Sequence, residues 1–319
     1  MSTTSPTSVP TAAAPADRAY LVERVGEAAV VQLYADGFRD LPLREKTLIW
    51  HLGQAAIAGR DIFYDQRYAH NLEMRDVLEA IVRQERCEAQ DGQRQDGALA
   101  AIERYTKLFW INTGPYNNLT ARKFVLECTP AAFREVVHAA ARRGAAFPLR
   151  NGETLDAMLD RLEPFFFDAD VDPTVTSKTP PPGRDMLTAS ANNLYVDVTS
   201  TDLLGLVEEY GLNSRLVKRD GRLVEEVYRV GETYGAQIGA IVRHLDAAIP
   251  YATEAMAAAL RALITFYATG RRADREAYDI AWVEDKASPV DTINGFIEVY
   301  LDARSIKGEI GRASCRERV

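Results

Sequence analysis

A carboxylate and a phenol lie two residues apart on an alternating stretch near the C-terminal end. Residues 288–301 read Ser-Pro-Val-Asp-Thr-Ile-Asn-Gly-Phe-Ile-Glu-Val-Tyr-Leu. The period-two alternation predicts a half-buried strand, in which Glu298 and Tyr300 share one face. In a helix the two side chains would point roughly 200° apart. A carboxylate accepts hydrogen bonds from a cation and a phenol donates one to a carbonyl, so this pair suits the wall of a cleft.

The same alternation divides the rest of the strand between two faces. We predict that one face packs on a core and consists of Ile293, Gly295, Ile297, Val299 and Leu301. The opposite face then carries Asn294 and Phe296 together with Glu298 and Tyr300. These four residues are the candidate ligand-binding residues. The sequence predicts no catalytic residue and no metal ligand.

Other residues with chemical potential lack the spacing that their chemistry needs. The four histidines, His51, His70, His138 and His244, form no HExxH and no other short metal-ligand pair. No GxSxG elbow, Walker A loop or GxGxxG motif is present. The three cysteines follow no CxxC pattern, which is typical of buried thiols in a reducing compartment. The chain therefore contains no complete catalytic apparatus of a familiar type.

Composition excludes several classes of partner. A chain of 319 residues with 47% hydrophobic residues is large enough to bury a sizeable core. Its net charge of -8 leaves no basic surface for nucleic acid. No apolar run approaches the ~20 residues of a membrane span. Residues 1–15 are rich in Ser, Thr, Pro and Ala and lack the features of a signal peptide, so we expect a disordered leader and a cytoplasmic protein.

The elements that position the candidate strand are mainly helical. Apolar spacing predicts helices over 16–38, 45–58, 74–88, 98–110, 130–143, 154–162, 199–210, 234–245, 253–269 and 275–284. Residues 59–66 are more simply interpreted as a polar connector with aromatic anchors. Asp220-Gly221 predicts a hairpin between 214–218 and 222–228. The expected fold class is α+β, predominantly helical, with few strands.

The last eleven residues stand apart from this pattern. Residues 309–319 read Glu-Ile-Gly-Arg-Ala-Ser-Cys-Arg-Glu-Arg-Val and resemble the in-frame translation of a common sequencing adapter. We therefore expect 309–319 to be an artefact, and the parent protein to continue beyond Gly308. The expected organisation is a leader over 1–15, one folded segment over 16–308, and this tail.

Four segments together carry a resemblance to a known family. They are Arg-Asp-Ile-Phe-Tyr-Asp-Gln (60–66), Leu-Thr-Ala-Ser-Ala-Asn-Asn-Leu-Tyr (187–195), Tyr-Gly-Leu-Asn-Ser-Arg-Leu-Val-Lys (210–218) and Gly-Phe-Ile-Glu-Val-Tyr (295–300). In this order they resemble the N-terminal half of the dipeptidyl peptidase III family, and its bacterial branch most closely. The GFIExY motif after Ser-Pro-Val-Asp is the most specific part.

The resemblance implies a zinc exopeptidase that releases dipeptides from the free N-terminus of short peptides. In that family one lobe holds zinc on an HExxGH motif, and the other contains a small β-barrel core. Most of this chain would form the second lobe, an incomplete substrate-binding lobe with a small mixed or barrel-like sheet. The family's Glu and Tyr that contact the substrate's N-terminal portion match Glu298 and Tyr300. The zinc motif has no counterpart here, so we expect zinc in the parent protein, and neither zinc binding nor hydrolysis by this chain alone.

Two further interpretations remain open. The chain could be a non-catalytic peptide-binding protein, or a helical scaffold without a peptide site. The DNA sequence beyond the codon of Gly308 separates the first from a truncated peptidase, because only the latter continues into HExxGH. An unchanged peptide affinity after Glu298→Ala would favour the scaffold.

Overall fold

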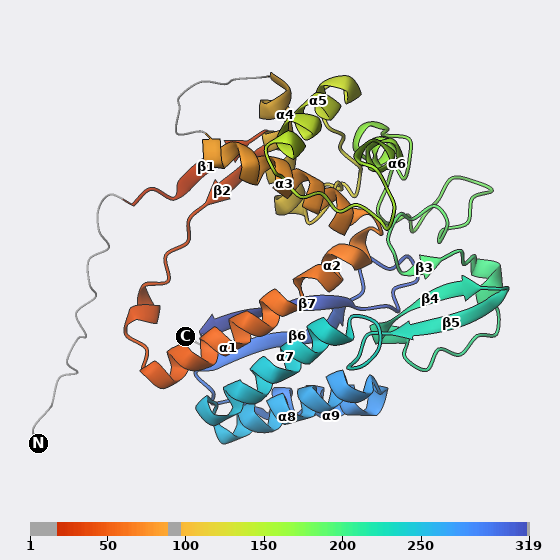
Figure 1. Ribbon diagram of the computed structural model, residues 1–319. Coiled ribbons are helices and arrows are strands. Elements are labelled where there is room, and N and C mark those ends of the chain that lie inside the picture. Colours follow the sequence, from red (N-terminus) through yellow and green to blue (C-terminus); the bar gives the residue numbers. More distant parts are fainter. Residues whose placement is uncertain (1–17, 89–96, 318–319) are drawn as a thin grey trace, which may run out of the picture.

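The structure is a computed structural model that describes residues 18–88 and 97–317 (Figure 1). Helices make up most of its regular structure. They are α1 (Leu43–Ala58), α2 (Arg60–Arg67), α3 (Asn71–Glu88), α4 (Gly97–Asn112), α5 (Pro130–Arg142), α6 (Leu155–Phe167), α7 (Gly235–Ala248), α8 (Glu254–Thr269) and α9 (Arg272–Glu284). The strands are β1 (Leu21–Val25), β2 (Ala28–Val31), β3 (Tyr195–Val196), β4 (Ser214–Arg219), β5 (Arg222–Val227), β6 (Val290–Glu298) and β7 (Glu309–Glu317). The predicted α+β class is confirmed.

The strands form three small separate sheets. β1 pairs with β2, and β6 pairs with β7, both antiparallel. In the third sheet β4 lies between β3, which is parallel to it, and β5, which is antiparallel. None of these sheets closes on itself, so the prediction of a barrel-like sheet is wrong for the described residues. Sheets of two or three short strands have too few strands to close.

Two hydrophobic cores divide the helices. Figure 1 shows α3 to α6 grouped at one end, and α1, α7, α8 and α9 gathered around β6 and β7 at the other, with α2 between the groups. Phe109 and Phe166 are buried in the first core. Leu52, Leu263 and Phe296 are buried in the second. The candidate strand is therefore part of the second core.

Most predicted helices and the hairpin are confirmed, and local chemistry explains their bounds. The hydroxyls of Thr129, Thr154 and Thr253 accept hydrogen bonds from the first turns of α5, α6 and α8. Gly270 ends α8 in the left-handed region with φ 71°. The predicted hairpin turn between β4 and β5 lies at Asp220-Gly221.

Three predictions of local structure are wrong. Residues 21–31 form the β1–β2 hairpin in place of a helix, because Gly26 turns the chain at φ 59° and the valines favour strands. Residues 60–67 are helix α2, whose buried face includes Ile62 and Gln66, and not a connector. The predicted helix over 199–210 shrinks to a 3₁₀ turn, Ser200–Leu203, because Leu204 is extended and Gly205 has φ 77°.

The terminal segments have separate outcomes. The predicted leader, 1–15, lies outside the described residues. Residues 309–317 of the tail that resembles an adapter form strand β7. The backbone of this strand pairs with β6. Among the described residues no helix is long and apolar enough to cross a membrane.

Candidate substrate-binding site at the end of β6

The buried face of β6 is opposite to the one that the alternation predicts. Val290, Thr292, Asn294 and Phe296 are buried, whereas Ile293 and Ile297 are only partly buried. Apolar side chains occupy both faces of this strand, so alternation alone does not decide which one packs on the core. The assignment of Asn294 and Phe296 to an open cleft face is therefore corrected.

Phe296 is a core residue. Its side chain is fully buried and lies between the rings of Tyr228, at 5.4 Å, and Phe266, at 6.5 Å. Asn294 is buried as well, and its amide donates a hydrogen bond of 2.6 Å to the hydroxyl of Thr292. In this conformation neither side chain is accessible to a ligand.

A change of register exposes the end of the strand. Between Phe296 and Glu298, two residues of β6 correspond to one step along β7, which is a β-bulge. Glu298 is consequently exposed although Phe296, two residues earlier, is buried. Tyr300 follows with 74% of its surface exposed. Of the four predicted residues, the structure leaves only Glu298 and Tyr300 accessible.

The residues after the strand are held by hydrogen bonds from distant segments. We call residues 299–308 the β6–β7 connection. The carbonyl of Leu301 accepts hydrogen bonds from the amide of Asn192, at 2.9 Å, and from the hydroxyl of Thr176, at 2.6 Å. These two bonds fix the main chain directly after Tyr300.

Asp302 organises the turn within the β6–β7 connection. Its fully buried carboxylate accepts hydrogen bonds of 2.8 Å from the main-chain amides of Ile306 and Lys307. The hydroxyl of Tyr195, next to β4 in the small sheet, donates to the same oxygen at 2.9 Å. Burial, together with the nearby Asp302 carboxylate, raises the pKa of Tyr195, so its phenol stays protonated as a donor.

A buried ion pair ties the connection to the segment before β4. The fully buried ammonium of Lys307 lies 2.6 Å from one oxygen of Glu208 and 3.2 Å from the hydroxyl of Ser214. Arg304 binds the other oxygen of Glu208 at 2.6 Å. Burial lowers the pKa of Lys307 in spite of the Glu208 carboxylate. A buried charge of this kind needs its partner, because an unpaired ion in the core is costly.

Gly308 closes the connection in a space that has no room for a side chain. Its carbonyl accepts from the amide of Gln66 on α2 at 3.0 Å, and its amide donates to the carbonyl of Leu212 at 2.7 Å. A Cβ atom added here would lie 2.9 Å from the Leu212 side chain and 3.0 Å from the Phe296 main chain. Glycine is the residue that permits this close approach.

The four segments that carry the family resemblance thus converge on one place. Segment 60–66 contributes Gln66, segment 187–195 contributes Asn192 and Tyr195, and segment 210–218 contributes Leu212 and Ser214. All of them bind the connection that follows segment 295–300. Figure 1 shows α2 and β3 beside the ends of β6 and β7.

Sequence reasoning did not identify these supporting residues. Gln66 and Asn192 lie inside two of the segments that carry the family resemblance. Their polar side chains within those segments were the only sequence feature that could have indicated a supporting role. Asp302, Lys307 and Glu208 lie outside them and carried no signal, because their roles depend on contacts between residues far apart in the chain.

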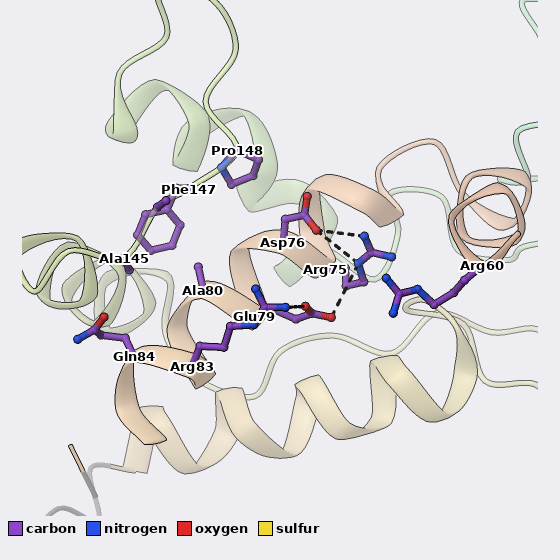
Figure 2. A pocket seen from close by; sticks show the side chains of 11 residues that line it. Arg60, Arg75, Asp76, Glu79, Ala80, Arg83, Gln84, Ala145, Phe147 and Pro148 are labelled. Atoms are coloured by element: carbon purple, nitrogen blue, oxygen red, sulfur yellow. Dashed lines mark hydrogen bonds and ion pairs between the residues drawn. The ribbon is translucent and has the colours of Figure 1, made fainter. Parts of the chain in front are cut away.

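A separate pocket of about 570 Å³ lies along α3 and does not include Glu298 or Tyr300. Figure 2 shows Phe147 and Pro148 across from Ala80, and the guanidinium of Arg75 among acidic side chains. Arg75 lies 2.7 Å from Asp61 and 3.2 Å from Asp76. The charge of Arg75 is therefore balanced by carboxylates within the protein.

Comparison with known proteins agrees with this convergence. Residues 190–312 match the model of peptidase family M49. This range includes the strand, the β6–β7 connection and most of their support, and it confirms the predicted resemblance to the dipeptidyl peptidase III family. No curated protein matches the chain.

Two solved structures of dipeptidyl peptidase III are similar to the chain in fold. The enzyme from Caldithrix abyssi has a TM-score of 0.53 and 18% identity over 87% of this chain and 40% of its own. The enzyme from Corallococcus sp. strain EGB has a TM-score of 0.57 and 18% identity over 91% of this chain and 41% of its own. The chain therefore spans about 40% of the length of these peptidases. At this identity the two matches show a likeness of fold.

The described residues do not contain the ligand set of a metallopeptidase. Within 18–84 and 97–311, where the structure describes the side chains, no three His, Cys, Asp or Glu residues come together in a group that could hold a metal ion. No catalytic step through zinc is therefore derived from this chain.

Proposed function

We propose that this chain forms the peptide-anchoring part of a zinc-dependent dipeptidyl peptidase that releases dipeptides from the free N-terminus of short peptides. The observation that carries the proposal is an exposed carboxylate, Glu298, at the end of a strand whose next residues are fixed from three directions. A rigid support lowers the entropic cost of ordering the site when a ligand binds.

Each exposed side chain has a distinct role in this proposal. Glu298 accepts a charge-assisted hydrogen bond from the α-ammonium group of the peptide. The phenol of Tyr300 hydrogen-bonds the first peptide unit. The buried side chains of Asn294 and Phe296 hold the strand against the core and make no contact with the peptide.

The division of labour within the complete enzyme follows from the resemblance. This chain binds the N-terminal end of the peptide, and a zinc ion held by another part of the parent protein would supply the Lewis acid that the hydrolysis needs. We expect no hydrolysis by the chain alone, and we place the protein in the cytoplasm.

Peptide affinity tests the anchoring role. Isothermal titration calorimetry compares a pentapeptide carrying a free N-terminus with its N-acetylated form. A hydrogen bond to a charged group contributes about 1.5–3 kcal/mol, so Glu298→Gln should weaken binding of the free peptide by roughly 10- to 150-fold. Binding of the acetylated peptide should be weak and unchanged. Glu284→Gln, on the exposed surface of α9, is the matched control. Equal affinities of both peptides for the unsubstituted chain would refute the proposal.

A non-catalytic peptide-binding protein is the alternative. The two functions share Glu298 and Tyr300 and differ in turnover by the parent protein. Chelator-sensitive release of dipeptides by a longer protein from the same locus favours the peptidase. Peptide binding without turnover by that protein favours the alternative, and dipeptide release by the 319-residue chain itself would contradict our expectation that this part is inactive.

A further inference from the structure

Two histidines from distant parts of the chain face each other between α1 and α7. His51 and His244 are 193 residues apart in sequence, and their Nδ1 atoms are 3.5 Å apart. Both side chains are partly buried. Neither residue lies in the β6–β7 connection or among the groups that hold it.

The separation of the two nitrogens decides what the pair can do. The pair lies at the limit of hydrogen-bond distance, longer than the about 2.7–3.2 Å that is typical of an N–H···O bond. Two nitrogens bound at 2.0–2.1 Å to one ion lie about 3.4 Å apart at a tetrahedral centre such as Zn²⁺, and about 2.9 Å apart at the right angle that Cu²⁺ and Ni²⁺ prefer. The observed 3.5 Å is close to the tetrahedral value, and binding of Cu²⁺ or Ni²⁺ requires the two rings to move closer together. The ring planes differ by 46°, and rotation about the soft χ2 angle of histidine changes the direction of each lone pair.

We propose that His51 and His244 together bind a divalent transition-metal ion through their Nδ1 atoms. Neutral imidazole is a good ligand for Zn²⁺, Cu²⁺ and Ni²⁺, and water completes the coordination. The site is a different one from the zinc site of the peptidase family, and it does not rest on the proposed function.

Aromatic side chains pack against both rings. Trp50 packs edge-on against His51 at 4.8 Å and against His244 at 5.8 Å. Tyr251 stacks on His51 at 6.0 Å. Burial, His51 and Arg243 lower the pKa of His244, which favours the neutral form that a metal requires.

The other two histidines have different surroundings and serve as controls. His70 stacks on Phe165 at 3.6 Å. The Nε2 atom of His138 lies 2.8 Å from Asp156, at a place where no second histidine is found among the described contacts. A metal bound to scattered single histidines would therefore respond to loss of His138 as much as to loss of His51.

A metal ion bound by the two histidines would join α1 and α7, two helices that already share a hydrophobic core. Leu48 and Leu52 of α1 and Ile241 and Leu245 of α7 are buried in the same cluster. A metal that binds the folded chain alone raises its thermal stability in proportion to the logarithm of metal concentration. The site therefore acts as a metal-dependent clamp between α1 and α7.

Nickel titration of the 319-residue chain tests the proposal. The cysteines are first blocked with N-ethylmaleimide, so that thiolates do not compete for the metal. Bound Ni²⁺ should quench the fluorescence of Trp50 and raise the melting temperature. His51→Gln and His244→Gln should each weaken Ni²⁺ binding at least tenfold in calorimetry, and the double variant should be no weaker than either single one. His138→Gln should bind as the unsubstituted chain does.

Two further measurements make every outcome decisive. Trp50→Phe should remove most of the quenching while calorimetric binding persists, which locates the ion beside this residue. Lowering the pH to 5.5 should weaken binding by the unsubstituted chain, a result that needs no variant to fold. Equal Ni²⁺ affinity in His51→Gln, His244→Gln and His138→Gln would overturn the proposal, as would binding that does not change with pH.

Discussion

The side-chain amide of Asn192 donates a hydrogen bond of 2.9 Å to the main-chain carbonyl of Leu301. The same amide nitrogen donates to the carbonyl of Val175 at 3.0 Å. Asn192 is buried, so water does not replace either bond when the side chain is lost. One amide thus fixes the main chain immediately after Tyr300, on which the proposed peptide contact depends.

Asn192→Ala should reduce both stability and peptide affinity. Each carbonyl keeps another donor, the hydroxyl of Thr176 at Leu301 and the main-chain amide of residue 192 at Val175, so the substitution removes two net hydrogen bonds of about 0.5–1.5 kcal/mol each. We expect the free energy of unfolding, measured in urea, to fall by at least ~1 kcal/mol, and peptide binding to weaken even where the chain is fully folded. Asn118→Ala is the control, because Asn118 is exposed and its side chain makes only a long contact of 3.4 Å with Ile111. Normal peptide affinity in folded Asn192→Ala would show that this bond does not position the site.

Local signals predicted the parts of the fold that local chemistry determines. Apolar spacing predicted most of the helices and Asp220-Gly221 predicted the hairpin turn, because each signal lies within a few neighbouring residues. The same signals failed over 16–38, where five apolar positions fit a helix but Gly26 turns the chain. They also failed for α2, whose buried Gln66 satisfies groups more than 200 residues away.

The candidate site was predictable only in part for the same reason. A motif placed Glu298 and Tyr300 on an accessible edge, and the structure leaves both exposed. The bulge before Glu298 depends on the partner strand, so alternation could not reveal it. That bulge is what separates exposed Glu298 from buried Phe296.

Truncation of Phe296 and Tyr300 tests the corrected faces of β6. Phe296 is fully buried, so Phe296→Ala should lower the free energy of unfolding by about 3–5 kcal/mol. Tyr300 is 74% exposed, so Tyr300→Ala should change the free energy of unfolding by no more than about 0.5 kcal/mol. Urea denaturation of both variants gives the comparison. Similar losses at the two positions would restore the arrangement in which Phe296 faces an open cleft.

Alanine substitution at two glycines should change the stability of the chain in opposite directions. Gly221 has φ 75° in the turn between β4 and β5, a conformation that costs an alanine about 1–2 kcal/mol. Gly53 lies within α1, where an added Cβ meets nothing within 4 Å. Gly221→Ala should therefore destabilise the chain, and Gly53→Ala should stabilise it by roughly 0.5–1 kcal/mol. Thermal melting of the two variants checks both signs, and a stabilised Gly221→Ala chain would contradict the assigned turn.

Acid should weaken the ion pair between Arg161 on α6 and Glu153, which lies just before that helix. Arg161 binds Glu153 through two hydrogen bonds, at 2.8 and 2.9 Å, and Glu73 at 2.9 Å. Hydrogen bonds from Arg161 and the Arg150 amide lower the pKa of Glu153 from 4.5 to about 2. The unfolded chain therefore takes up this proton first as the pH falls. The contribution of the Glu153–Arg161 ion pair to stability is present above pH 4.5 and is lost progressively toward pH 2.

Glu153→Gln should make the free energy of unfolding less dependent on pH across this window, whereas Glu284→Gln should not. An identical pH dependence in Glu153→Gln and the unsubstituted chain would show that this ion pair contributes nothing to acid sensitivity.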